Sequence, residues 1–209
     1  MKEIKSWGEL PVGMLEEIRA VGENTDDEDT KTLTIAGILA GKTFKEMLNL
    51  PLEETQRLIA NTAFLYTEPA KKKLSSVYTL NGTKYEILKK AEKMTTAQFI
   101  DYQAIARESF NRVSEFLAIF FIPEGHEYND GKYDKQQVID DIANYLSTEE
   151  ALGIADFFIS RCVRLMQRTL LLLEAKMAVL KLGRKDKTRM LAAETEKMIK
   201  DLRSIYGWR

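Results

Sequence analysis

Cysteine and histidine are scarce in this chain of 209 residues. It contains one cysteine, Cys162, and one histidine, His126. A single cysteine excludes an internal disulfide and a zinc site built from several cysteines. Cys162 lies beside Val163 in a helical pattern, whereas a nucleophilic cysteine needs an adjacent base and a partly open, electropositive setting. We therefore expect a protein that is not an enzyme and that binds no metal and no cofactor.

Proline, glycine and uncharged apolar runs are also limited. Four prolines and eleven glycines exclude a low-complexity chain. The most apolar stretch, residues 147–182, is interrupted by arginine, lysine and glutamate, which predicts a core helix and no membrane span. The first six residues are too polar for a signal peptide. These features together predict a protein of the reducing cytoplasm.

The net charge is small, but the two signs are unevenly distributed. The formal net charge of the whole chain is −1. Residues 1–70 carry 13 acidic and 7 basic side chains, a net of −6, and residues 160–209 carry 5 acidic and 13 basic side chains, a net of +8. We favour an electrostatic contact, between the two ends of the chain or between neighbouring copies, over nucleic-acid binding. Acidic residues are interleaved in the basic segment, unlike a concentrated footprint for phosphates.

Apolar residues at helical spacing are abundant. Two long runs, Thr95–Ile122 and Ser147–Leu182, place apolar residues three and four positions apart, which predicts two long helices, each with an apolar face. A polar hinge over residues 123–134 and a short helix separate them. We predict a mostly α fold, a multi-helix domain in which the core residues that join the two long helices are Phe157 and one or both of Phe120 and Phe121.

A β-hairpin is predicted at about residues 76–87. The pair Asn81-Gly82 favours a two-residue type I′ turn, and residues with high strand propensity flank it on both sides. Pairing Leu80 with Thr83 would place Tyr78 opposite Tyr85 on one face. A ribbon of two strands is barely stable in water, so we expect this face to pack on the helices.

Two short strings resemble ligand-binding motifs. Gly41-Lys42-Thr43 resembles the end of a phosphate-binding loop, but the full motif requires glycine at position 36, which is alanine here. Asn129-Asp130-Gly131 resembles part of a calcium loop, but the first and twelfth positions would be His126 and Gln137, which lack the required carboxylates. We interpret the first string as a helix stop followed by a helix cap, and the second as a turn.

The second long run carries a basic stripe. Arg161, Arg164 and Arg168 recur at spacings of three and four and therefore lie on one helix face. The simplest interpretation is a solvated face, and the alternative is contact with a partner or another subunit.

The C-terminal segment has a thin apolar stripe. We predict a single helical domain over residues 1–183 and a basic helical extension over residues 184–209 that contacts another subunit or a partner. Met198 and Trp208 are its candidate contact residues, because methionine adapts to varied partners and tryptophan is favoured at interface hot spots. The competing interpretation is that this helix packs on its own domain.

Six short strings follow one another along the chain: SWGELPVGM, LPLEE, FLYTEP, LNGTKYE, FLAIFFIPEG and YDKQQVIDDIANYLSTEEALGIADFF. In this order they resemble small proteins of tailed bacteriophages that infect gut Bacteroidetes-type hosts. These proteins are described as tail-assembly-chaperone-like, and their genes lie among those for virion morphogenesis. The resemblance covers about residues 4–160.

The resemblance implies a non-enzymatic protein of phage assembly. A tail assembly chaperone would cover the apolar helices of a tape-measure protein until tail-tube subunits replace it, in the host cytoplasm or with retention in the virion. The first alternative is a structural virion protein, such as a helical head–tail adaptor or connector-ring subunit that contacts portal or neck proteins and forms a homo-oligomer. The second alternative is a nucleic-acid-binding helical module.

Overall fold

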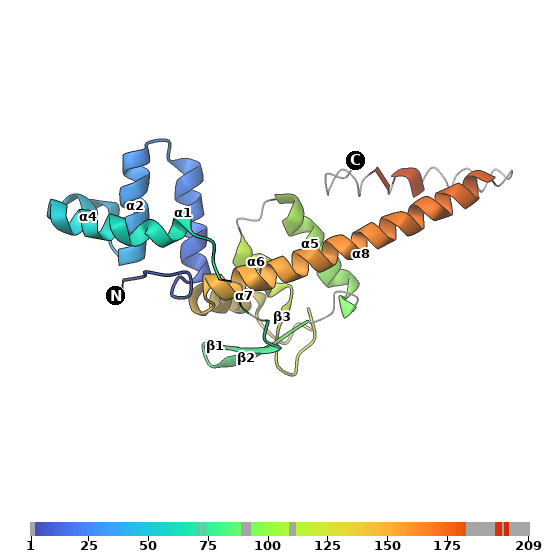
Figure 1. Ribbon diagram of the computed structural model, residues 1–209. Coiled ribbons are helices and arrows are strands. Elements are labelled where there is room, and N and C mark those ends of the chain that lie inside the picture. Colours follow the sequence, from blue (N-terminus) through green and yellow to red (C-terminus); the bar gives the residue numbers. More distant parts are fainter. Residues whose placement is uncertain are drawn as a thin grey trace. The chain divides into compact units, whose positions relative to one another are not determined.

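The computed structural model describes residues 3–70, 72, 74–88, 93–108, 112–182, 195–197 and 199–200. The chain divides into two compact units, Met1–Asp156 and Phe157–Arg209, which we treat separately. The predicted boundary between residues 183 and 184 lies outside the described residues. The described chain is mostly helical (Figure 1), with these elements: α1 Val12–Asn24, α2 Glu28–Ala40, α3 Phe44–Leu48, α4 Leu52–Ala60, η1 Asn61–Tyr66, β1 Val77–Leu80, β2 Thr83–Ile87, α5 Thr96–Glu108, α6 Val113–Ala118, β3 Phe121–Pro123, α7 Lys135–Tyr145 and α8 Thr148–Leu182.

Local side-chain chemistry sets several helix ends. Gly41 ends α2 in the left-handed conformation, with φ of 65°. Thr43 then begins α3 through a capping box, in which Glu46 Oε2 accepts from the Thr43 backbone N–H at 2.7 Å and the Glu46 N–H donates to Thr43 Oγ1 at 3.3 Å. The predicted helix stop and cap at residues 41–43 are confirmed, since these contacts satisfy backbone groups that a helix end leaves free.

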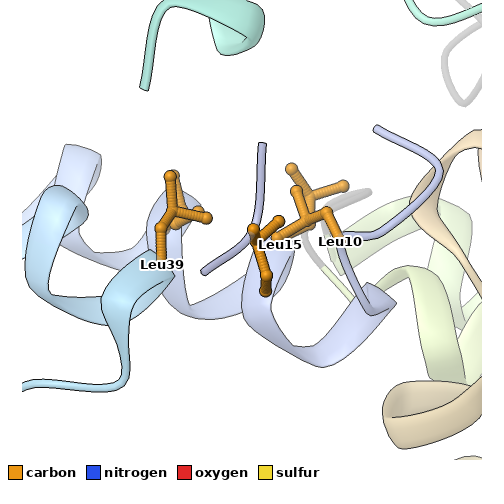
Figure 2. Close-up of a cluster of buried hydrophobic side chains, with 5 residues drawn as sticks. Leu10, Leu15 and Leu39 are labelled. Carbon is orange, nitrogen blue, oxygen red and sulfur yellow. The ribbon is translucent and has the colours of Figure 1, made fainter. Parts of the chain in front are cut away.

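The first part of the N-terminal unit packs around α1 and α2. Leu10, Leu15 and Leu39 lie beside one another in its core (Figure 2), and Ile4 and Ile18 complete this buried cluster. The spacing of Leu15 and Ile18 places both on one face of α1. Removal of these side chains from water stabilises the α1–α2 hairpin by the hydrophobic effect.

The hairpin forms where it was predicted and in the predicted register. Leu80 pairs with Thr83 and Tyr78 with Tyr85. The Tyr78 and Tyr85 rings both contact Phe121, with centroid distances of 5.5 Å and 6.2 Å. The two tyrosines therefore share the packed face of the hairpin, as expected.

The prediction of one long helix over Thr95–Ile122 is wrong. The run Thr95–Ile122 is divided into α5 and α6, and it ends in β3, which pairs with β2 to complete a three-stranded sheet (Figure 1). A new helix can begin at Val113 because the Glu16 carboxylate accepts from the Ser114 N–H at 2.7 Å. The aromatic and β-branched residues before Pro123 suit a strand as well as a helix, and pairing with β2 decides between them.

Aromatic side chains fill the core beside the sheet. Phe120 and Phe121 are fully buried, as predicted. Phe116 packs against Phe120 with a centroid distance of 5.3 Å. Phe157, in contrast, is only partly buried, and its neighbour Phe158 is the fully buried residue, so that part of the prediction is wrong. Adjacent residues of a helix point in directions about 100° apart. If the buried face is assigned one residue too early, Phe157 is predicted to be buried in place of Phe158.

The second predicted long helix is confirmed. Helix α8 runs from Thr148 to Leu182, 35 residues or about 52 Å in length. Ser147 caps it, since its hydroxyl accepts from the Glu150 N–H at 3.3 Å. No helix among the described residues is long and apolar enough to cross a membrane.

Candidate protein interface

The first turn of α8 is fixed to the N-terminal unit. The Thr148 N–H donates to the Leu10 carbonyl at 2.7 Å. Lys72 Nζ lies 3.0 Å from Glu149 Oε2, and this hydrogen bond, outweighing partial burial, raises the pKa of Lys72, so the ammonium group stays charged. These contacts hold the first turn of α8 within the N-terminal unit.

The three arginines of that stripe differ in their surroundings. The Arg161 guanidinium lies over the Phe157 ring, 4.2 Å from its centroid, in a cation–π contact. Arg164 and Arg168 are exposed. The structure thus brings the three onto one helix face, and two of them are exposed to solvent.

Two exposed leucines extend this face, although the apolar pattern of residues 147–182 predicted a core helix. Leu171 is 64% exposed and Leu172 is 72% exposed. From ideal helix geometry, they and the three arginines lie within a sector of about 100°. The four consecutive leucines at residues 170–173 span almost a full helical turn, so they cannot all face the core. The run itself therefore predicts that some of these leucines are exposed. We call Arg164, Arg168, Leu171 and Leu172 the α8 stripe.

A face of α8 next to the stripe is buried in the first half of the helix. Ile154, Phe158 and Cys162 recur every four residues and are each at most 1% exposed. Cys162 therefore lies on the inward face of the helix, where a cysteine behaves as a small apolar residue. This buried position agrees with a structural role for the Cys162 thiol.

The remaining candidate contact residues, Met198 and Trp208, lie outside the described residues. The described part of the tail, residues 195–197 and 199–200, is helical. Thr195 and Ile199 are buried, so one face of this helix is covered by the chain itself. That agrees with packing of the tail on its own unit along this face, and the contact with a partner stays a prediction.

The polar hinge after β3 is a structural link. Tyr128 donates its hydroxyl hydrogen to Asp101, and Lys135 Nζ donates to Asp101 at 2.9 Å and to the Tyr128 oxygen at 3.1 Å. Burial and the Asp101 carboxylate raise the pKa of Tyr128, so the phenol keeps its proton. Burial alone would raise the pKa of Asp101, but the bonds from Tyr128 and Lys135 and the lysine charge lower it below its usual range. The three groups join the hinge to α5 and α7.

The string Asn129-Asp130-Gly131 forms the predicted turn. Asn129 and Gly131 have positive φ angles of 59° and 71°. The Asp130 carboxylate accepts from the Lys132 N–H at 2.8 Å and lies 3.1 Å from His126 Nδ1. These contacts, the Lys132 bond first, lower the pKa of Asp130. Across the described ranges, no three His, Cys, Asp or Glu side chains gather as a metal site would require.

Comparisons with known proteins found no relative: no protein-family model matches the chain, and neither the curated proteins nor the solved structures include a similar one. The α8 stripe therefore stands on its own geometry as the candidate interface, an exposed strip of apolar and basic side chains on a long helix with a fixed start.

Proposed function

We propose that this protein is a non-enzymatic assembly protein of a tailed bacteriophage, similar to tail assembly chaperones, and that it binds its partner through the α8 stripe. The observation that carries the proposal is the exposure of Leu171 and Leu172 beside Arg164 and Arg168. Water-exposed leucines on a regular helix are a feature of protein-binding surfaces. The order of short strings along residues 4–160 supplies the biological setting.

The chemistry of the stripe defines the kind of partner. An amphipathic helix can lay its apolar residues against leucines at neighbouring turns of α8, as in recognition of helices by grooves and helix faces. Acidic residues beside that apolar face would meet Arg164 and Arg168. A segment of a tape-measure protein, long and helical, is the partner that we propose, and binding takes place in the cytoplasm of the bacterial host during assembly.

Co-expression with the tape-measure protein of the same phage tests the proposal. We expect the two to co-purify, and we expect Leu171→Ser with Leu172→Ser to abolish co-purification. Ile100→Ser, at another exposed apolar position on α5, is the matched control and should co-purify as the native chain does. Loss of partner binding in the control as well, or retention in the double variant, would contradict a role for the stripe.

A connector-ring subunit is a second candidate, favoured by the net charges of −6 over residues 1–70 and +8 over residues 160–209. Such a subunit stays in the particle, whereas a chaperone leaves it. Mass spectrometry of purified virions beside infected-cell extract distinguishes the two. Binding to DNA that weakens with added salt would instead favour the nucleic-acid module.

A further inference from the structure

A second exposed apolar surface lies on the N-terminal unit, at the junction of α3 and α4. Phe44 and Leu48 are one helical turn apart on α3, and they are 37% and 61% exposed. Leu52, the first residue of α4, is 72% exposed. We call these three residues the α3–α4 surface.

The α3–α4 surface is distinct from the core that holds α3 in place. Met47, between Phe44 and Leu48, is 1% exposed and packs with Ala36 and Leu58 in a buried cluster. A short surface helix with one buried residue normally carries polar residues on its outer side. Apolar residues on both sides of α3 therefore indicate that its outer side is covered in some state of the protein.

The charges next to this surface are acidic at its α4 end. Glu53 and Glu54 occupy the first turn of α4 immediately after Leu52. The nearest cation on α4, Arg57, is already bound in a two-point contact with Glu3, at 2.8 Å for each hydrogen bond. On α3, Lys45 and Glu46 lie between Phe44 and Leu48, and the Glu46 carboxylate is already bound to Thr43, so the net negative charge lies at the Leu52 end.

We propose that the α3–α4 surface of one copy binds the α8 stripe of a second copy. Leu48 and Leu52 would meet Leu171 and Leu172, and Glu53, on the solvent side of α4 next to Leu52, would meet Arg164 or Arg168. Each surface has an exposed apolar strip with charged residues at one end, and the charges of the two surfaces are opposite in sign. The net charges of residues 1–70 and 160–209 have the same complementary signs.

The two surfaces are different, so the contact is heterologous. In a pair of copies, each copy therefore keeps one of its two surfaces unoccupied. Such a contact continues from copy to copy and closes into a ring or extends as a filament. The apolar side chains involved are few compared with a stable interface of about 800 Å² per partner. The association is therefore reversible and depends on protein concentration.

The inference shares the α8 stripe with the proposed function, and so it rests on the stripe being a protein-binding surface, but its test uses the purified full chain alone. Sedimentation velocity over a range of concentrations gives the mass of the species. We expect the native chain to form dimers and larger species as concentration rises. Raising NaCl from about 0.05 M to about 0.5 M should weaken association about tenfold, because salt screens exposed charge pairs.

Two variants test the head-to-tail geometry. Leu48→Ser with Glu53→Lys removes the α3–α4 surface, and Arg164→Glu with Leu171→Ser removes the α8 stripe. Each variant alone should be monomeric, and an equimolar mixture should form a heterodimer that does not grow further. Ile100→Ser is the matched control and should associate as the native chain does. Circular dichroism and melting curves establish that each variant is folded.

Three results would overturn the proposal. A native chain that is monomeric at all concentrations excludes self-association. A variant without the α3–α4 surface that still dimerises indicates an isologous contact between α8 stripes. Variants that remain monomeric when mixed show that the two surfaces do not bind each other. Self-association without tape-measure binding would defeat the proposed function alone, and tape-measure binding by a strictly monomeric chain would defeat this inference alone.

Discussion

At the scale of single residues, Asp141 of α7 is a buried carboxylate that accepts three side-chain hydrogen bonds. Its side chain is 1% exposed and accepts hydrogen bonds from Tyr85 Oη at 2.5 Å, Gln137 Nε2 at 2.8 Å and Asn81 Nδ2 at 3.2 Å. Burial and this carboxylate raise the pKa of Tyr85, so the phenol stays a donor. One carboxylate thus holds the hairpin turn and β2 against α7.

Removal of that carboxylate is predicted to be costly. Asp141→Ala leaves the buried Tyr85 hydroxyl without its acceptor, and we expect the free energy of unfolding to fall by about 3 kcal/mol. Chemical denaturation measures the change. Asp140→Ala is the matched control, because Asp140 is exposed and surface substitutions change stability by about 0.5 kcal/mol or less. Equal losses in both variants would show that the buried bonds contribute little.

The exchange of Phe157 and Phe158 gives a second prediction at the residue scale. Phe158→Ala empties a fully buried site, and we expect a loss of about 3–5 kcal/mol. Phe157→Ala removes a partly buried ring and its contact with Arg161, so it should cost no more than about 1.5 kcal/mol. Urea denaturation of the two variants side by side checks the order, and a reversed order would mean that the helix face is misassigned.

At the scale of elements, glycine has opposite roles in a turn and in a helix. Gly82 in the hairpin turn has φ of +79°, a conformation that disfavours other residues. Gly22 lies within α1, and a Cβ there would meet only the Lys31 side chain, at 3.7 Å. The same substitution should therefore act in opposite directions at the two positions.

Gly82→Ala should destabilise the protein by about 1 kcal/mol through backbone strain. Gly22→Ala should stabilise it by about 0.5–1 kcal/mol, because alanine has the higher helix propensity. Thermal denaturation of both variants under one condition gives the signs. Matching signs would contradict either the turn conformation or the helix.

Helix α4 is linked to the N-terminal segment by an ion pair that predicts a pH dependence. Hydrogen bonds from Arg57, opposed by partial burial and helped by the charges of Arg57 and Lys5, lower the pKa of Glu3 from 4.5 to about 2. The folded state therefore binds the proton less tightly than the unfolded state. The stabilisation is complete above pH 4.5 and is lost as the pH falls toward 2.

Carboxyl ¹³C NMR titration of Glu3 measures this pKa directly. Arg57→Gln should move it back toward 4.5 and should reduce the dependence of stability on pH between 4.5 and 2. Lys84→Gln, which removes a lysine 3.7 Å from Glu124 instead, is the control and should leave the Glu3 titration unchanged. A Glu3 pKa that does not respond to Arg57→Gln would refute the pairing.

At the scale of the whole molecule, the burial of the C-terminal tail predicts the effect of its removal. Thr195 and Ile199 are buried, and so is Met177 on α8. Truncation after Gly183 should therefore leave the N-terminal unit folded, since its clusters of buried residues lie within residues 4–65 and 80–155. The distal part of α8 should become more accessible.

Limited proteolysis with mass spectrometry tests this expectation. In the truncated chain we expect new cleavage within residues 157–182, where Arg161, Arg164 and Arg168 are trypsin sites, and unchanged protection of α1 and α2. Global unfolding of the truncated chain would mean that the tail belongs to the main core. A folded chain that no longer assembles would assign the tail to the contact.

Local signals in the amino-acid sequence were enough to predict several elements. Periodic apolar residues with a cap at Ser147 predicted α8, Asn81-Gly82 predicted the hairpin and its register, and Gly41 to Thr43 predicted the junction of α2 and α3. These signals act over one turn or one strand pair, through backbone conformation and hydrogen bonds within a few residues. The basic stripe of α8 was also predicted, because helix geometry alone places residues three and four apart on one face.

Where a segment is compatible with more than one local structure, contacts with distant segments select the one that forms. The aromatic run before Pro123 fits a helix or a strand, and pairing with β2 selects the strand. Phe157 and Phe158 are equivalent in hydrophobicity, and packing selects Phe158 as the buried ring. Packing also leaves four leucines exposed: Leu48, Leu52, Leu171 and Leu172. Burial depends on which distant segments cover a side chain, a quantity that no local pattern contains, so both candidate binding surfaces became visible only in the folded chain.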